Sequence, residues 1–206
     1  MPRLFALSGK IASGKDTYAH SLKEHYAPAV VRSFSAPLKS EIQLALQSPE
    51  WAKELSLPER TRELVDIVRC ERDNGVSHGE HDSSSMRLLL QSWGTDFRRA
   101  EDPNYFVRKL LSRVEKDLSR GLYVVVSDCR FRNELSALRD RGAITIRLSV
   151  SEEEQRGRSA GRGSDFSAQI ASHASENDLD SERFDIEIPA GLSLEDGWTH
   201  LLRELS

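Results

Sequence analysis

The sequence predicts an α/β fold of three layers, in which a five-stranded parallel sheet is flanked by helices on both faces. Apolar, β-branched runs alternate along the chain with segments of helical periodicity, and a glycine-rich loop joins the first run to the first helical segment. Because parallel strands need crossover connections, the intervening helices must cover the faces of the sheet. We expect the 206 residues to form a single domain.

Short apolar runs are the predicted strands. The run over residues 122–128 predicts a strand most clearly, because it is continuous, β-branched and ends on the acidic residue Asp128. The other strands are expected over residues 3–8, 30–35, 143–150 and 184–188.

Helices are expected where apolar residues recur at helical spacing. Pro37 predicts the first position of one helix, where its missing N–H costs nothing. Glycines are expected to end three others, at Gly94, Gly121 and Gly142. The predicted helices are residues 17–25, 59–72, 86–93, 103–120, 131–141 and 194–205. Residues 74–85 are rich in Gly, Ser, Asp and His and are expected to form a mobile loop.

The stretch between the second and third predicted strands is far too long for one crossover helix. We therefore expect an inserted helical lobe over residues 37–121, standing above the carboxyl ends of the strands, where open α/β sheets bind ligands. Residues 1–36 and 122–206 would form the core. Residues 151–178 combine arginines with glycines and serines, a composition that favours a hinged lid.

Composition excludes several classes of protein. Hydrophobic residues make up 38% and charged residues 30% of the chain, and the net charge is −4 with a pI of about 5.9. An acidic balance disfavours a nucleic-acid partner, and the absence of long apolar runs and of a signal pattern disfavours a membrane partner. Cys70 and Cys129 have no companions at metal-ligand spacing, so we expect reduced thiols and a cytoplasmic protein.

The glycine-rich loop carries the main functional signal. Residues 9–15 fit the pattern G-x-x-x-x-G-K between a predicted strand and a predicted helix, which is the context that a phosphate-binding loop requires. Backbone N–H groups and a helix N-terminus would face the phosphates, and Lys15 would reach them. The candidate phosphate-binding residues are Lys10, Ala12, Ser13, Gly14, Lys15, Asp16 and Thr17.

Three residues are candidate Mg²⁺ ligands. Asp16 stands where a serine or threonine is usual, and Thr17 offers a hydroxyl one residue later. Asp128 ends an apolar strand, as the metal-associated acid of phosphate-loop enzymes does. The alternatives are that Asp16 is a first-turn helix acid and that Asp128 caps the helix that follows it.

Arginines form three groups that suit phosphate oxygens. Arg98 and Arg99 follow Trp93 and Gly94, and Arg130 and Arg132 follow Asp128. The third group, in the expected lid, is Arg156, Arg158 and Arg162. Any one of these arginines has the alternative of being a solvated surface charge.

These stretches together resemble the deoxynucleoside monophosphate kinases of bacteriophages, within the nucleoside monophosphate kinase branch of phosphate-loop proteins. The ending Lys15-Asp16-Thr17 is typical of that family, whereas an acid is common where Ser35 stands. Beyond Ser151 the resemblance is one of composition, followed by His173-Ala174-Ser175-Glu176. The matching stretches are residues 7–10, 13–17, 34–39, 90–96 with Arg98 and Arg99, and 126–134.

The resemblance implies a phosphate-loop kinase fold and transfer of a phosphoryl group from MgATP to a deoxynucleoside monophosphate. It implies that Lys15, Asp128, Arg130 and Arg158 are catalytic and that Arg156 and Arg162 join the loop in binding ATP. Glu134 would orient Arg130 through an i,i+4 ion pair. The implied acceptor-binding residues are Ser35, Leu38, Lys39, Gln91, Trp93, Arg98, Arg99, Arg130 and Arg132. For Trp93, a place in the core of the lobe is the alternative to stacking on a base.

Three other functions fit parts of the pattern. A related kinase with another acceptor, such as phosphomevalonate, would share the loop and the acid-ended strand. A nucleotide switch or ATPase subunit should lack the inserted lobe and the second arginine group, and a polynucleotide kinase is disfavoured by the acidic pI. The expected partners are small molecules, and the protein is expected to be a monomer or a homodimer.

Overall fold

The computed structural model describes residues 3–75, 84–160 and 173–206. It contains a five-stranded sheet with the strand order β2-β3-β1-β4-β5, and every neighbouring pair is parallel. The strands are β1 (Leu4–Gly9), β2 (Ala29–Arg32), β3 (Tyr123–Cys129), β4 (Ile144–Leu148) and β5 (Ile186–Ile188). The five predicted strands and the predicted fold class are therefore confirmed.

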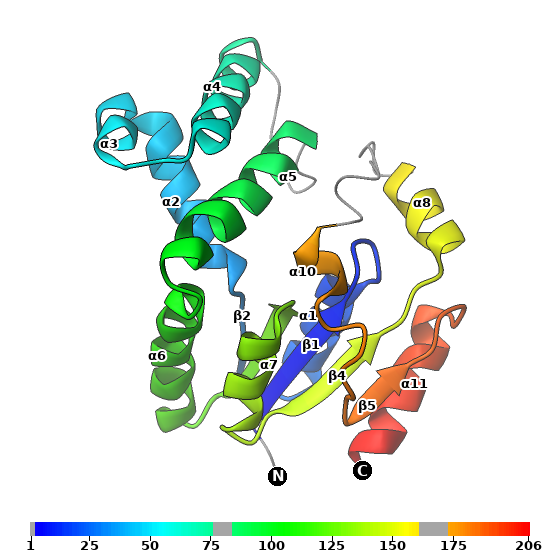
Figure 1. The fold of residues 1–206 in the computed structure, drawn as a ribbon. Coiled ribbons are helices and arrows are strands. Elements are labelled where there is room, and N and C mark those ends of the chain that lie inside the picture. The colour runs from blue at the N-terminus through cyan, green and yellow to red at the C-terminus, as the bar shows by residue number, and fades with distance from the viewer. Residues whose placement is uncertain (1–2, 76–83, 161–172) are drawn as a thin grey trace.

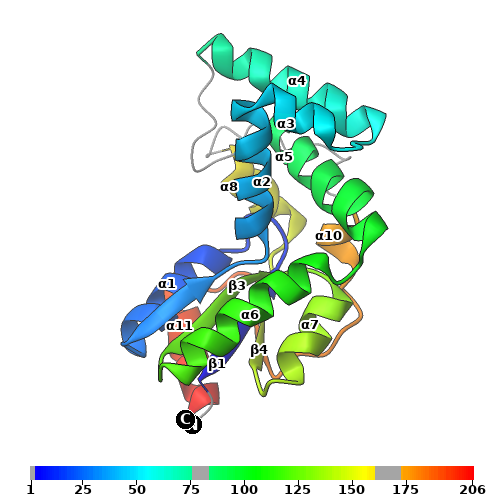
Figure 2. The same cartoon turned by 90° about the vertical axis from the view of Figure 1, so that its left-hand side faces the viewer.

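Helices cover both faces of the sheet (Figure 1; Figure 2). One face carries α1 (Lys15–His25) and α11 (Leu194–Leu205), and the other carries α6 (Tyr105–Ser119) and α7 (Arg132–Arg139). The central strand β1 is buried along its whole length. Its side chains alternate between the two layers, because Leu4 and Ala6 face one hydrophobic cluster while Phe5 and Leu7 face the other.

Most of the helices inserted between β2 and β3 stand above the carboxyl ends of the strands (Figure 1). They are α2 (Ser35–Gln47), α3 (Pro49–Glu54), α4 (Glu59–Asp73), α5 (Ser84–Gln91) and the π-helix η1 (Ser92–Arg99). The last inserted helix, α6, returns along the face of the sheet. One hydrophobic cluster runs from Leu64 and Trp93 among these helices to Val124 and Val126 in β3. The inserted helices thus pack continuously onto one face of the sheet.

One predicted helix end is wrong. Gly94 was expected to terminate a helix, but α5 passes directly into η1, which runs through Gly94 to Arg99. A glycine ends a helix by taking a positive φ, and Gly94 does not, whereas Gly121 (φ 80°) and Gly142 (φ 73°) do and follow α6 and α7 as predicted. The helix predicted to begin at Pro37 begins at Ser35. Of the loop expected over residues 74–85, residues 76–83 lie outside the described part of the chain, and Ser84 and Ser85 belong to α5.

Two further helices lie between β4 and β5 in the sequence. They are α8 (Glu152–Ala160) and α10 (Ala174–Asn177), which flank the undescribed residues 161–172. None of the helices in the described ranges has the length and apolarity to cross a membrane.

Candidate functional site

The glycine-rich loop of residues 9–14, which we call the phosphate loop, joins β1 directly to α1. A Cβ at Gly9 would lie 2.7 Å from the carbonyl oxygen of Leu148 and 2.5 Å from Ser13 Oγ, so any side chain there would force the loop or its neighbours to shift. Ala12 (φ 62°) and Gly14 (φ 92°) take left-handed backbone conformations, and Gly14 is the N-cap of α1. The strand–loop–helix arrangement that the motif requires is therefore present.

Lys15 is buried at the start of α1. Its ammonium group donates a hydrogen bond to the carbonyl oxygen of Lys10 at 3.0 Å. Burial, and then the charge of Arg130, lowers the pKa of Lys15 to about 7, while the carboxylates of Glu176, Asp16 and Asp128 act in the opposite direction. An anion at the phosphate loop would favour the charged ammonium, so the lysine suits a phosphate ligand.

An orphaned hydroxyl supports the same ligand class. Ser13 Oγ is buried and has no hydrogen-bond partner in the described part of the chain. Buried hydroxyls are normally paired, and the N-terminus of α1 directly after this serine contributes positive potential. The hydroxyl, the loop amides and Lys15 together fit phosphate oxygens.

The two acidic candidates for Mg²⁺ have different surroundings. Asp16 and Thr17 are exposed on the first turn of α1. The carboxylate of Asp128 accepts hydrogen bonds from the backbone N–H groups of Phe34 at 2.7 Å and Ser35 at 2.9 Å. Asp128 thus binds the start of α2. It does not cap the helix that follows it, because the N-cap of α7 is Phe131. Residues 3–75, 84–160 and 173–206 contain no cluster of three His, Cys, Asp or Glu side chains that would hold a metal by itself.

Arg130 lies in the turn between β3 and α7 and contacts α10. Its guanidinium forms an ion pair with Glu176 and donates to the carbonyl oxygen of Ser175 at 3.1 Å. The second carboxylate oxygen of Glu176 accepts a hydrogen bond from the N–H of Ile11 in the phosphate loop, at 2.8 Å. Arg130 and the phosphate loop therefore share one carboxylate.

The expected ion pair between Glu134 and Arg130 is wrong. The carboxylate of Glu134 pairs instead with Arg99 at 2.6 Å and accepts the backbone N–H of Arg130 at 2.9 Å. The guanidinium of Arg99 also lies over the rings of Phe106 and Phe131, at 4.6 and 4.2 Å from their centroids. Burial raises the pKa of Glu134 to about 7, opposed first by the charge of Arg99. The i,i+4 ion pair requires both residues to lie on one helix, whereas α7 begins at Arg132 and Arg130 lies in the turn before it.

Arg98 is held by the carboxylate of Glu41, which lies where α2 meets η1 and α6. Glu41 accepts hydrogen bonds from Arg98 Nε at 2.8 Å, from Trp93 Nε1 at 3.1 Å and from the hydroxyl of Tyr105. These hydrogen bonds outweigh burial and hold the pKa of Glu41 below its usual range. Trp93 has no exposed surface and stacks near Trp51. Of its two sequence-based alternatives, the structure shows the one in the core of the lobe.

The remaining basic residues of the predicted site differ in whether they contact the phosphate loop. Arg158 donates to the carbonyl oxygen of Ala12 at 3.2 Å and pairs with Glu154 at 2.9 Å, so it touches the phosphate loop. Lys10 pairs with Asp180 at 2.9 Å. Arg132 is held by Ser181 and Glu182, and Arg156 is exposed beside Glu152. Arg162 lies outside the described residues.

The start of α2 and its neighbours carry the remaining acceptor candidates. Ser35 follows β2 and shares a hydrogen bond with Ser33. Leu38 is buried and faces Gly94, where a Cβ would lie 3.2 Å from Leu38 Cδ2 and 3.2 Å from Arg99 Nη1. Lys39 is exposed, and Gln91 ends α5 half-buried.

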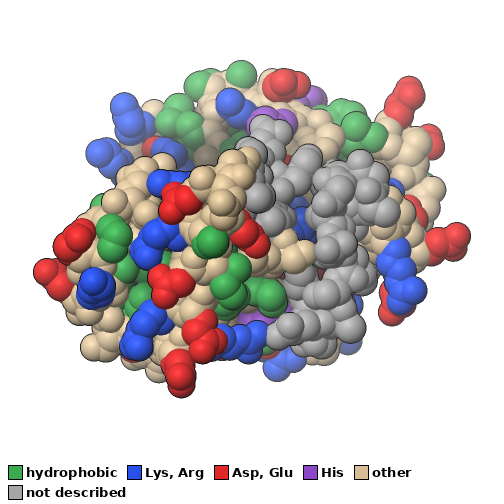
Figure 3. Space-filling model, turned by 90° about the horizontal axis from the view of Figure 1, so that it is seen from above, with side chains coloured by type: hydrophobic (Ala, Val, Ile, Leu, Met, Phe, Trp, Pro, Cys, Tyr) green, Lys and Arg blue, Asp and Glu red, His purple; other side chains and the backbone are tan. Residues whose placement is uncertain are grey.

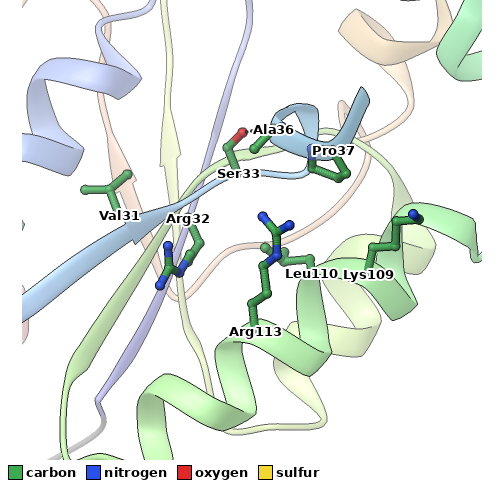
Figure 4. Close-up of a pocket in the computed structure, with 8 residues that line it drawn as sticks. All are labelled: Val31, Arg32, Ser33, Ala36, Pro37, Lys109, Leu110 and Arg113. Carbon is green, nitrogen blue, oxygen red and sulfur yellow. Dashed lines mark hydrogen bonds between the residues drawn. The ribbon is translucent and has the colours of Figure 1, made fainter. Parts of the chain in front are cut away.

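Two cavities lie near these elements. One, of about 210 Å³, opens beside Ser13, Gly14 and Thr17. Its wall consists of Arg158 and of apolar residues of β4, β5 and the segment after β5, namely Leu148, Ile188, Pro189 and Leu192. The other, of about 140 Å³, lies outside the junction of β2 and α2 and is lined by Arg32, Lys109 and Arg113 among others (Figure 4). None of the predicted site residues lines this second cavity.

Sequence patterns missed two carboxylates that hold predicted site arginines, Glu176 and Glu41. In the sequence, Glu176 stands out only as the end of His173-Ala174-Ser175-Glu176, and Glu41 is one of many acidic residues on helices. Each is identified by its arginine partner, and those partners lie far away in the sequence.

Comparison with known proteins gives two findings. The model of the deoxynucleotide monophosphate kinase family matches residues 50–195. A phosphomevalonate kinase of Drosophila melanogaster is 31% identical over 196 residues, which cover 90% of this chain and 87% of that protein.

The fold also has a counterpart among solved structures. The crystal structure of TT1252 from Thermus thermophilus superposes with a TM-score of 0.55 and 18% identity, over 99% of this chain and 96% of that one. At this identity the likeness concerns the fold alone.

Proposed function

Because the chain belongs to the deoxynucleotide monophosphate kinase family, we propose that it transfers the γ-phosphoryl group of ATP to the phosphate of a deoxynucleoside monophosphate. The observation that carries this proposal is the phosphate loop, in which the orphaned Ser13 hydroxyl and the buried Lys15 both suit phosphate oxygens. The shared carboxylate of Glu176 brings Arg130, a second phosphate-binding side chain, to the same loop.

The donor is proposed to lie along the phosphate loop. Lys15 and the loop amides would hold the phosphates, and the 210 Å³ cavity with its apolar wall and Arg158 would take the base and ribose. Mg²⁺ would neutralise charge on the donor phosphates, with Asp16, Thr17 and Asp128 as oxygen donors. Because these residues do not form a closed metal cage, the ion would keep water and phosphate oxygens among its ligands, as Mg²⁺ usually does.

The acceptor is proposed to lie between the inserted helices and α10. Arg98, Arg99 and Arg130 each come with a carboxylate that fixes the guanidinium, and Ser35, Leu38, Lys39 and Gln91 would complete the acceptor site. The acceptor phosphate is already an anion, so no general base is needed. Catalysis would rest on positioning and on neutralising charge during transfer.

Phosphomevalonate is the second candidate acceptor. The Drosophila relative carries that name, and it matches 90% of this chain. The burial of Trp93 also removes the aromatic face that a nucleobase would stack on, whereas a mevalonate chain needs none. Both candidate reactions would use the same loop and the same arginines, and they differ only in the acceptor.

Partners and setting remain predictions from the sequence. We propose small-molecule substrates with no nucleic-acid or membrane partner, and a cytoplasmic monomer or homodimer of bacteriophage origin. Acidic and basic side chains of the described residues are interspersed on the face seen in Figure 3, a mixture that does not favour nucleic acid.

A coupled ADP-release assay tests the proposal. MgATP is combined with a panel of nucleoside and deoxynucleoside monophosphates, with phosphomevalonate, and with no acceptor, for the wild type and for Lys15→Ala. Release that requires a deoxynucleoside monophosphate and disappears in the variant supports the first candidate. ADP release only with phosphomevalonate would mean that phosphomevalonate, and not a deoxynucleoside monophosphate, is the acceptor. ADP release without any acceptor would indicate an ATPase.

A further inference from the structure

The phosphate loop, the β3–α7 turn and α10 lie close together (Figure 1). Glu176 of α10 contacts both the loop and the turn. It is the innermost of four acidic residues on one short segment, and its side chain is 3% exposed. The other three acids lie further out, where Asp178, Asp180 and Glu182 contact Arg132, Lys10 and Arg139.

The two carboxylate oxygens of Glu176 have different partners. One pairs with the guanidinium of Arg130, which also donates to the carbonyl oxygen of Ser175 at 3.1 Å. The other accepts the N–H of Ile11 at 2.8 Å. Both oxygens are thus used, and they connect a loop near the N-terminus to an arginine and a helix more than a hundred residues later.

We propose that Glu176 is a positioning residue of the phosphoryl-transfer site, which holds the guanidinium of Arg130 in place beside the phosphate loop. This inference rests on the proposed function of Arg130.

Stability alone gives a poor account of this carboxylate. A buried ion pair is often no more stabilising than well-packed apolar residues of similar size, because both charges lose their water. The segment is already anchored by the buried side chain of Leu179 and by the ion pair between Asp180 and Arg147 at 2.7 Å. A fixed carboxylate is useful where a guanidinium must keep one direction.

Charge balance supports the same role. Lys15 is buried and Arg130 is half-buried, they are close enough to repel each other, and Glu176 attracts both. Without the carboxylate, repulsion would drive the guanidinium away from the loop. A displacement of about 1 Å of a positioning group costs on the order of a hundredfold in rate.

The test compares Glu176→Gln with Glu187→Gln, which neutralises an exposed acid on β5. With the acceptor that the wild type uses, Glu176→Gln is expected to lower kcat by about 10- to 100-fold while KM for ATP stays close to that of the wild type. Glu187→Gln should leave both unchanged. An unchanged kcat in Glu176→Gln, or a change in KM alone, would overturn the proposal.

A double-mutant cycle asks whether Glu176 acts through Arg130. In an Arg130→Gln background, Glu176→Gln should lower kcat by a much smaller factor than it does in the wild type, because the group that Glu176 positions is gone. Equal costs in the two backgrounds would show an independent, structural role. Glu176→Asp keeps the charge and should recover part of kcat. If the glutamine variant does not fold, the same cycle with the aspartate variant decides. A wild type that phosphorylates no acceptor would instead refute the proposed function itself.

Discussion

Gly9 is the residue on which the shape of the phosphate loop most depends. Its missing side chain lets the loop pass close to β4, since a Cβ would lie 2.7 Å from the carbonyl oxygen of Leu148, a backbone atom that has little room to move. We expect Gly9→Ala to fold with a loss of about 1–3 kcal/mol in the free energy of unfolding. The shifted loop should weaken ATP binding by at least about tenfold.

Calorimetry with ATP and urea unfolding measure the two effects of Gly9→Ala. The matched control is Gly157→Ala, because a Cβ at Gly157 meets nothing within 4 Å and the residue lies inside α8. That variant should be neutral or slightly stabilised. Wild-type ATP affinity in Gly9→Ala would contradict the expected strain.

The two cysteines differ in burial and therefore in reactivity. Cys70 is exposed, whereas Cys129 is buried in β3. Burial raises the pKa of the Cys129 thiol well above its usual value, so the reactive thiolate does not form near neutral pH. We expect a thiol reagent at pH 8 to modify one cysteine in the native protein and both in denaturant. Cys70→Ser should show no fast-reacting thiol, and two fast thiols in the native wild type would contradict the burial of Cys129.

At the scale of the elements, η1 positions Arg98 and Arg99 on a π-helix, a form that the sequence pattern does not predict. Its close packing depends on Gly94, whose Cβ would lie 3.2 Å from both Leu38 Cδ2 and Arg99 Nη1. In Gly94→Ala the gain in helix propensity partly offsets this crowding, so the free energy of unfolding should fall by no more than about 1 kcal/mol. The displaced Arg99 should raise KM for the acceptor by about tenfold. Steady-state kinetics with each substrate varied measures this, and an equal rise in KM for ATP would contradict a local effect.

Sequence patterns predicted those elements whose signals are local. The strands are continuous β-branched runs, and two glycines and a lysine within seven residues predict a loop between a strand and a helix, so the strands and this arrangement were predicted correctly. The helix end at Gly94 was predicted wrongly. A glycine can either end a helix with a positive φ or allow a close contact inside one, and at Gly94 the packing of Leu38 and Arg99 decides for the close contact. The same holds for the carboxylates. Glu134 pairs with Arg99 and Glu176 pairs with Arg130, and both contacts join residues too far apart in the sequence for local spacing to predict.

At the scale of the whole molecule, one hydrophobic cluster joins the inserted helices to the sheet. It includes Leu64 and Trp93 on one side and Val124 and Val126 on the other, all 8% exposed or less. Separating the inserted helices from the sheet would expose this apolar surface at a cost of about 25 cal/mol per Å². The two parts should therefore unfold together.

Tryptophan fluorescence can follow the inserted helices alone. Trp51 and Trp93 lie there, 6.4 Å apart between ring centroids, and the third tryptophan, Trp198, lies on α11. In Trp198→Phe, urea unfolding followed by fluorescence should therefore have the same midpoint as unfolding followed by far-ultraviolet circular dichroism, which reports all the helices. A fluorescence midpoint at lower urea would mean that the inserted helices melt first, and that the shared cluster is too weak to couple them to the sheet. Wild-type circular dichroism is the control, because it shows whether removing the Trp198 indole has itself shifted the transition.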